Sequence, residues 1–349
     1  DLSQSAPADP FAARFLSRAA PDDLAAFSPE ALTGLAKFFE REGLRRGAGQ
    51  SFLRVLTPSL DADGFTLGAS LVATINEDRP FLVDSIVGAL KETGLRILAV
   101  FHPILRAGRD PSGKTVEYKL DAGAQGAAES MIAVLVPRLS AEKAAELQAS
   151  LAGVLGDVAT AVADWKPMLM KLAESITELR MRRPKNATAD EIEESLKFLE
   201  WLQQNHFTFL GCRDYVFDPE GDGRLTPQLQ SGLGLLRDPE RRVIRRGSDR
   251  AALTPEVRGF LMQRSPLIIT KSNVRSTVHR RVLQDYVGVK RYDAGGNLVG
   301  ERRFVGLFTS AAYNESPHDI PFIKSKVLGV ERRAELGRSS HNAKALAQV

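Results

Sequence analysis

The order of strands and helices between Gln50 and Asp157 constrains the fold of this chain most. Apolar residues alternate at strand spacing, recur at helical spacing, and then return to strand spacing. The order strand, helix, strand, strand, helix predicts most of a ferredoxin-like α+β sandwich. The expected elements are strands at 51–56 and 65–75, a helix after Pro80 that ends at Gly94, strands at 95–106 and 129–137, and a helix from Ser140 to Gly156.

The part of the chain after residue 204 predicts a second, mainly antiparallel domain with a C-terminal helix that begins at Ser316-Pro317. Two apolar segments flank Asp293–Asn297, which has the composition of a hairpin turn. Those segments are therefore expected to pair antiparallel. The expected domains are a helical lead-in over 1–49, the first domain over 50–157, a helical linker over 158–204 and the second domain over 205–349.

A stripe of apolar residues runs through 157–180 at spacings of four and three, like the seam of a coiled coil. Pro167 lies inside this stripe and is expected to kink or divide the helix. Two interpretations stay open: the helix packs on its own domain, or it joins other domains or subunits. The candidate interface residues are Trp165, Leu169, Leu172 and Ile176.

Composition is typical of a globular protein of about two domains, with 349 residues of which 43% are hydrophobic. No apolar run approaches the roughly 18–20 residues that span a bilayer, so no membrane partner is expected. No basic and apolar signal segment opens the chain. The single cysteine, Cys212, excludes an internal disulfide framework, and the expected localisation is a reducing cytoplasm.

The charges are numerous and mixed, with 47 basic against 43 acidic residues. The richest basic stretch, Arg237–Arg250, also contains acidic residues and is expected to be a solvated loop. A nucleic-acid surface would need basic residues on one face together with exposed aromatic residues. No nucleic-acid partner is therefore expected, and a nucleic-acid-binding module is the weakest alternative.

No residues predict a catalytic, cofactor or metal site in this chain. The five histidines are scattered without metal-ligand spacing. Gly232-Leu233-Gly234 lacks the third glycine and the following helix of a dinucleotide fingerprint, and no Gly-x-Ser-x-Gly occurs.

The loop before the first expected helix is the best candidate for ligand binding. It joins a strand to a helix N-terminus, where free backbone N–H groups favour an anion such as an amino-acid carboxylate. An ordinary strand–helix connection is the alternative. The candidate effector-binding residues are Asn76, Glu77, Asp78 and Arg79.

This loop resembles the signature of ACT domains, which are small regulatory modules that sense amino acids. Asp78, Arg79 and Pro80 match the pattern, as does the later Gly94–Ile97. Phe81 stands where the family has a glycine that lets a ligand approach the backbone.

Longer blocks resemble the bacterial large NAD-specific glutamate dehydrogenases, in the same order from about Phe65 to the end of the chain. The matching segments are 80–85 with 102–103, 201–202 with 206–211, 232–234, 271–273 with 276–280, 286–290, 300–304, 309–313 and 319–321.

The resemblance implies that this chain is a regulatory and assembly segment without a cofactor of its own. In the family, NAD and the catalytic residues belong to a dehydrogenase domain further along the chain, and the front region holds ACT-like and PAS-like domains. The implied partners are that dehydrogenase domain, other subunits of a homo-oligomer and an amino-acid effector. The parent reaction would convert L-glutamate, NAD and water to 2-oxoglutarate, ammonia and NADH. A stand-alone amino-acid sensor is the alternative.

Overall fold

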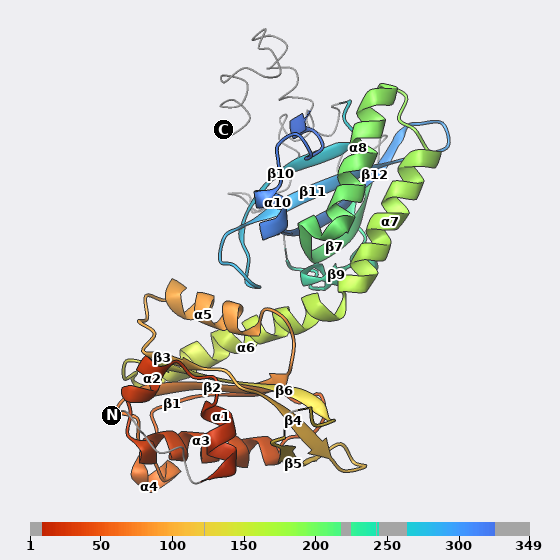
Figure 1. The fold of residues 1–349 in the computed structure, drawn as a ribbon. Helices are drawn as coiled ribbons and strands as arrows, with labels where there is room; N and C mark the ends of the chain where they lie inside the picture. The colour runs from red at the N-terminus through yellow and green to blue at the C-terminus, as the bar shows by residue number, and fades with distance from the viewer. Residues whose placement is uncertain (1–8, 122, 218–224, 242, 244–263, 325–349) are drawn as a thin grey trace, which may run out of the picture. The chain divides into compact units, whose positions relative to one another are not determined.

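The computed structural model describes residues 9–121, 123–217, 225–241, 243 and 264–324, and the chain forms two compact units. The first unit comprises Asp1–Ala159 together with Thr277–Arg281. The second comprises Thr160–Ser276 and Val282–Val349. Each contains a mainly antiparallel sheet with helices (Figure 1), which confirms the expected α+β class.

The sheet of the first unit has six strands within the described residues, and these strands pair antiparallel. Its order is β1–β2–β6–β4–β5, with β3 also paired to β6. The strand beside β2 at the edge is β1, which precedes β2 in the chain. The strands are β1 (Phe52–Leu56), β2 (Ser70–Glu77), β3 (Ala99–Phe101), β4 (Ile104–Arg109), β5 (Thr115–Lys119) and β6 (Ala127–Val136).

Helices cover both faces of this sheet (Figure 1). On one face lie α1 (Pro10–Leu16) and α3 (Pro29–Leu44), whose phenylalanines form the core together with alternate residues of β2 and β6. Both helices begin with a capping side chain followed by proline, which suits the first helical turn. On the other face lie α5 (Leu82–Glu92) and α6 (Ala141–Ala163). Two shorter helices are α2 (Pro21–Ala25) and α4 (Leu60–Asp63).

Several element boundaries differ from those expected. The segment 65–69 is not strand. The helix expected to end at Gly156 continues to Ala163, because a glycine costs a helix only about 1 kcal/mol and the apolar stripe continues past it. The strand expected at 95–106 is divided before Pro103, which has no N–H for a ladder. The short edge strand β5 was not expected.

In the second unit, two helices pack on one face of the sheet (Figure 1). They are α7 (Trp165–Met181) and α8 (Ala189–Trp201), the latter opened by a capping box at Thr188. The sheet order is β10–β11–β12–β7–β8, and β9 also pairs with β7. The strands are β7 (Phe207–Phe217), β8 (Leu225–Pro227), β9 (Leu233–Gly234), β10 (Leu267–Arg275), β11 (Leu283–Tyr292) and β12 (Leu298–Phe308).

The expected hairpin is confirmed, since β11 and β12 pair antiparallel and the Asp293 N–H donates to the Asn297 carbonyl at 3.0 Å. Short helical segments complete this unit: π-helical η1 (Leu202–His206), the 3-10 turns η2 (Leu229–Ser231) and η3 (Leu235–Arg237), and α10 (Ser310–Asn314). The C-terminal helix expected from Ser316 is not present at 316–322, and its continuation beyond residue 324 lies outside the described residues.

The break in the long helical stripe falls at Asp164, between α6 and α7, rather than at Pro167. Pro167 lies in the first turn of α7, where its missing N–H has no intrahelical acceptor to lose. Among the described helices, none is both long and apolar enough to cross a membrane.

Candidate effector site

The four predicted effector residues do not converge on one point. Asn76 and Glu77 are the last two residues of β2, and neighbouring residues of a strand project from opposite faces of the sheet. Asn76 therefore lies on the face that carries α5, and Glu77 on the face that carries α3. Asp78 and Arg79 follow in the connection to α5, and Asp78 is exposed.

On the α5 face, Asn76 belongs to a row of buried polar side chains. Its amide donates to the Thr74 hydroxyl at 2.5 Å, and its cross-strand partner is Ser130. The Ser130 hydroxyl in turn lies 2.8 Å from His102 Nε2. Burial lowers the pKa of His102, although the nearby Asp78 carboxylate acts in the opposite direction. Asn76 is thus occupied by a partner of its own, and it is only 5% exposed.

On the α3 face, Glu77 pairs with Arg79 at 2.8 Å and accepts a hydrogen bond from the Gly49 N–H at 3.2 Å. The hydrogen bond from Arg79 is the main reason that the pKa of Glu77 is lowered. Both side chains are partly exposed, so this pair stabilises the fold little. The pair places one anion at the end of β2 and one cation in the connection to α5.

A buried carboxylate next to this pair was missed by sequence reasoning. Glu129, the cross-strand partner of Glu77, has no exposed surface. It lies 2.7 Å from Arg46 Nη1 and 2.5 Å from Arg109 Nη2, and it accepts a hydrogen bond from the Tyr118 hydroxyl at 2.7 Å. Burial, followed by this contact with Glu129, raises the pKa of Tyr118. The sequence signal that could have indicated this buried carboxylate is an acidic residue, Glu129, within an otherwise apolar strand.

Phe81 has a left-handed backbone conformation at the N-cap of α5, with φ 73° and ψ −1°. A bulky residue held there costs about 1–3 kcal/mol unless its surroundings compensate. Phe81 thus adopts a backbone conformation that favours glycine, at the position where the ACT signature has that residue. No side chain caps α5, and the first N–H groups of a helix have no intrahelical acceptor.

The first two turns of α5 contact the segment Thr277–Arg281 of the same unit. The His279 N–H donates to the buried Ser85 hydroxyl at 2.9 Å, and His279 Nδ1 lies 2.9 Å from Asp84. The His279 ring lies 4.9 Å from the ring of Phe81. Both segments are among the blocks that resemble glutamate dehydrogenases, 80–85 and 276–280, but no local sequence pattern indicates that they meet.

The four candidate interface residues lie on α7, mostly inside the second unit. Leu172 and Ile176 are buried in the core of that unit, and Leu169 packs partly against it. Trp165 alone is 48% exposed. At Leu172 and Ile176 the heptad spacing therefore reflects packing of α7 on its own sheet.

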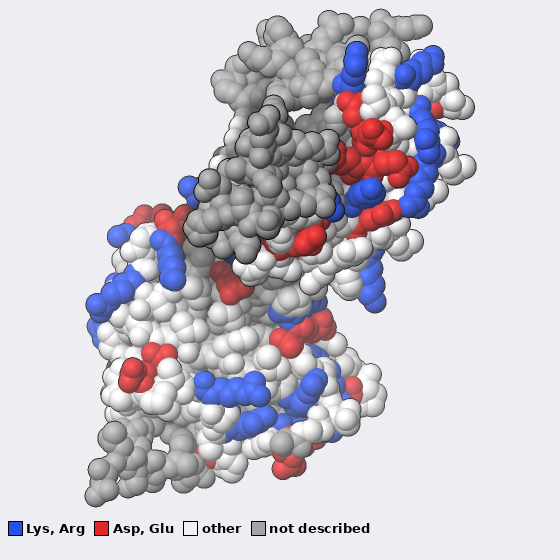
Figure 2. All heavy atoms as spheres, turned by 45° about the horizontal axis from the view of Figure 1, so that its top comes forward, with Lys and Arg blue, Asp and Glu red and all other residues white. Residues whose placement is uncertain are grey.

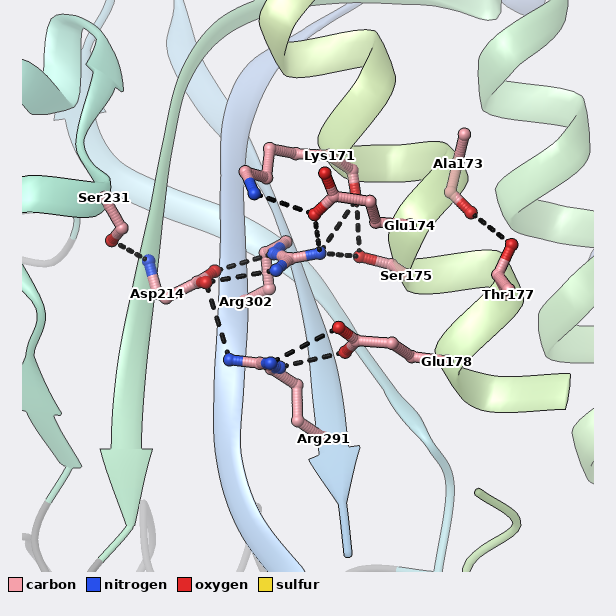
Figure 3. Close-up of polar contacts among 10 residues, drawn as sticks. All are labelled: Lys171, Ala173, Glu174, Ser175, Thr177, Glu178, Asp214, Ser231, Arg291 and Arg302. Carbon is pink, nitrogen blue, oxygen red and sulfur yellow. Dashed lines mark hydrogen bonds and ion pairs between the residues drawn. The ribbon is translucent and has the colours of Figure 1, made fainter. Parts of the chain in front are cut away.

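Two arginines of the sheet hold α7 in place through ion pairs (Figure 3). Arg302 is 2% exposed; it binds Asp214 through two nitrogens, at 2.6 and 3.1 Å, and donates to the Ser175 hydroxyl at 3.2 Å. Arg291 contacts Glu178 at 3.0 Å and Asp214 at 3.5 Å. Burial lowers the pKa of Arg302, but its anionic surroundings, Asp214 foremost, together outweigh burial and the net shift is upward. Since every group has a charged partner within the unit, we interpret this network as structural.

The remaining reactive groups show no arrangement for catalysis. Burial raises the pKa of the Cys212 thiol to about 12, so this thiol is inert. No group of metal-binding side chains occurs among the described residues. The Gly234 N–H donates to the Asp164 carboxylate at 2.7 Å, and so Gly232–Gly234 does not cradle a phosphate.

The basic stretch Arg237–Arg250 lies mostly outside the described residues. Within the described part, Arg237 pairs with Asp164. Figure 2 shows basic and acidic side chains interspersed on the face in view, rather than a continuous basic surface.

Most of the first unit is similar to a known family of domains. The family model described as "Glutamate dehydrogenase, ACT1 domain" matches residues 11–151. This match contains the candidate effector loop and the helix that follows it.

The similarity to curated relatives extends over most of the chain. An NAD-specific glutamate dehydrogenase of Halomonas elongata is 35% identical over 85% of this chain and 18% of its own length. One of Pseudomonas aeruginosa is 35% identical over 97% of this chain and 21% of its own length, and one of Mycobacterium tuberculosis is 28% identical over 82% and 16%. The expected resemblance is confirmed. The chain spans about a fifth of the length of the relatives that it matches.

Proposed function

We propose that this chain, whose residues 11–151 are similar to the ACT1 domain of glutamate dehydrogenase, is a regulatory and assembly segment of an NAD-dependent glutamate dehydrogenase. The parent enzyme would oxidise L-glutamate with NAD to 2-oxoglutarate and ammonia. The observation that carries the proposal is the family match, together with similarity to far longer enzymes over nearly the whole chain. That similarity favours a segment over a stand-alone sensor.

The catalytic work would belong to other parts of the parent enzyme. Gly232–Gly234 would not hold NAD, because these glycines are used in contacts within the second unit. This chain would instead pack against the dehydrogenase domain and other subunits of a cytoplasmic homo-oligomer. Its exposed Trp165 is the residue of the interface set that remains accessible.

The first domain, proposed to span 50–157 after a helical lead-in over 1–49, would be the effector-sensing ACT-like part. An amino acid would place its carboxylate at the uncapped N-terminus of α5, next to the connection that contains the exposed Asp78. The second domain, proposed to span 205–349 after a linker over 158–204, would be PAS-like; its antiparallel sheet with helices on one face supports that proposal.

Thermal unfolding of the chain with L-amino acids, 2-oxoglutarate and NAD tests this function. A ligand that binds the folded state raises the unfolding temperature by mass action. We expect a saturable shift with an L-amino acid that is reduced in Asp78→Ala, a shift unchanged in the exposed Lys91→Ala, and none with NAD. Glutamate oxidation by the chain alone would overturn the proposal.

A further inference from the structure

The segment Thr277–Arg281 covers the surface at which the effector would bind. We propose that it is an autoinhibitory strap, which must leave α5 before a carboxylate can reach the N-terminus of that helix. The inference rests on the proposed function. It adds to that function an occupant of the site that the chain itself supplies.

The contacts of the strap follow α5 along its length. At the N-terminal end, His279 uses its backbone N–H for Ser85 and its ring for Asp84 and Phe81. At the other end, Arg281 Nη1 lies 3.4 Å from Glu92. The strap therefore contacts the same turn that would supply N–H groups to a carboxylate.

A further contact fixes the strap to α6. The Thr277 hydroxyl donates to Asp157 at 2.5 Å. The base of the strap is closed by a hydrogen bond of 2.8 Å from the Ser276 N–H to the Val282 carbonyl. Because the strap is a short loop closed at its base, it is built to leave or return as one piece.

Backbone strain at the contact is consistent with a device that has two positions. Phe81 has φ 73° and His279 has φ 62°, and these two residues face each other. Left-handed conformations of bulky residues concentrate at clamps and switches, because they persist only while their surroundings hold them. Release of the strap would separate the Phe81 and His279 rings, so that each residue would lose the contact that supports its left-handed conformation.

Gly88 shows how closely the strap lies against the helix. A Cβ added at Gly88 would come within 2.9 Å of Arg281 Cγ. Gly88→Ala should therefore loosen the strap from a position that takes no part in binding a carboxylate.

The test compares the free and the bridged strap in the full chain. In one variant, Glu92→Cys and Arg281→Cys are joined by a short bismaleimide; the same variant capped singly with N-ethylmaleimide is the control. The buried Cys212 stays unmodified. A second variant, His279→Ala, releases the strap. Lys91→Ala, an exposed position on α5, is its control. Binding of glycine, L-glutamate and acetate is measured by thermal shift and calorimetry.

We expect His279→Ala and Gly88→Ala to lower the apparent dissociation constant of an amino acid about tenfold, because less of the protein is closed. Bridging should abolish binding, and capping should not. Equal affinity in the bridged, capped and released forms overturns the strap while leaving the effector site intact. Absence of binding in every form, His279→Ala included, overturns the effector site and its closure together.

Discussion

The ring centroids of Phe81 and His279 lie 4.9 Å apart with the rings tilted by 42°, although each residue occupies a left-handed backbone conformation that its side chain disfavours. The contact joins residues that lie almost two hundred positions apart in the sequence. It explains why a phenylalanine is tolerated where the ACT signature has glycine: its ring gains a partner that glycine could not have.

This explanation predicts the order of two substitutions. Phe81→Ala keeps the strain and loses the ring contact, whereas Phe81→Gly loses the contact but removes the strain. We therefore expect Phe81→Ala to be the more destabilising, by about 1 kcal/mol. Hydrogen exchange of the α5 amides measures the difference in stability between the two variants. Tryptophan fluorescence would not report on α5, because both tryptophans, Trp165 and Trp201, lie in the second unit. Greater protection in Phe81→Ala would contradict the explanation.

Removal of the buried charge at Glu129 should destabilise the first unit strongly. Glu129→Gln leaves Arg46 and Arg109 without their counter-charge, and a broken buried ion pair costs about 3–5 kcal/mol. Tyr118→Phe removes one hydrogen bond to the same carboxylate and should cost about 1 kcal/mol. Exchange protection of the β6 amides gives both values. Equal losses in the two variants would show that the charge is not what matters.

The network around Arg302 predicts a comparable effect in the second unit. Asp214→Asn takes the anion away from an arginine that is 2% exposed, so a loss of about 3–5 kcal/mol is expected. Urea unfolding followed by tryptophan fluorescence reports on this unit. Glu200→Gln, which breaks the exposed pair with Arg180, is the control and should change stability by less than about 1 kcal/mol.

Acid should weaken the first unit through His102. Burial lowers the pKa of this histidine below its ordinary value of 6.5, so the unfolded chain takes up a proton before the folded chain does. Its contribution is therefore complete above pH 6.5 and is lost as the pH falls below that value toward the folded-state pKa. Urea unfolding followed by circular dichroism should show a smaller loss in His102→Gln over this range. Parallel curves for the two proteins would refute the assignment.

The thiol of Cys212 should resist modification in the native protein. Its side chain is buried and its pKa is about 12, so almost no thiolate is present near neutral pH. A thiol reagent should label it only after the second unit unfolds, and the labelling rate should rise with urea. Rapid labelling without urea would mean that the sheet opens at β7 in the native state.

Sequence patterns predicted the elements whose local signals agree with their surroundings. The hairpin at Asp293–Asn297 is confirmed because its hydrogen bonds form within a few residues. The prediction that α6 ends at Gly156 was wrong, because the packing of the residues after Gly156 outweighs the small cost of one glycine in a helix.

The candidate site was harder to predict, for two physical reasons. Strand β2 extends to Glu77, beyond the end expected from the sequence. Because side chains alternate along a strand, this extension places Asn76 and Glu77 on opposite faces of the sheet. The contact of Ser85 with His279 depends on chain folding over a long range and has no local pattern. Of the four predicted residues, Asp78 is the exposed one that lies beside the N-terminus of α5.

The membership of Thr277–Arg281 in the first unit has a consequence for synthesis on the ribosome. The ACT-like sheet and α5 emerge early, but the segment that covers α5 emerges only after more than a hundred further residues, among them β7 to β10. Until then Phe81 and Ser85 are uncovered in the nascent chain. The first unit therefore gains its last segment only after most of the second unit has been synthesised.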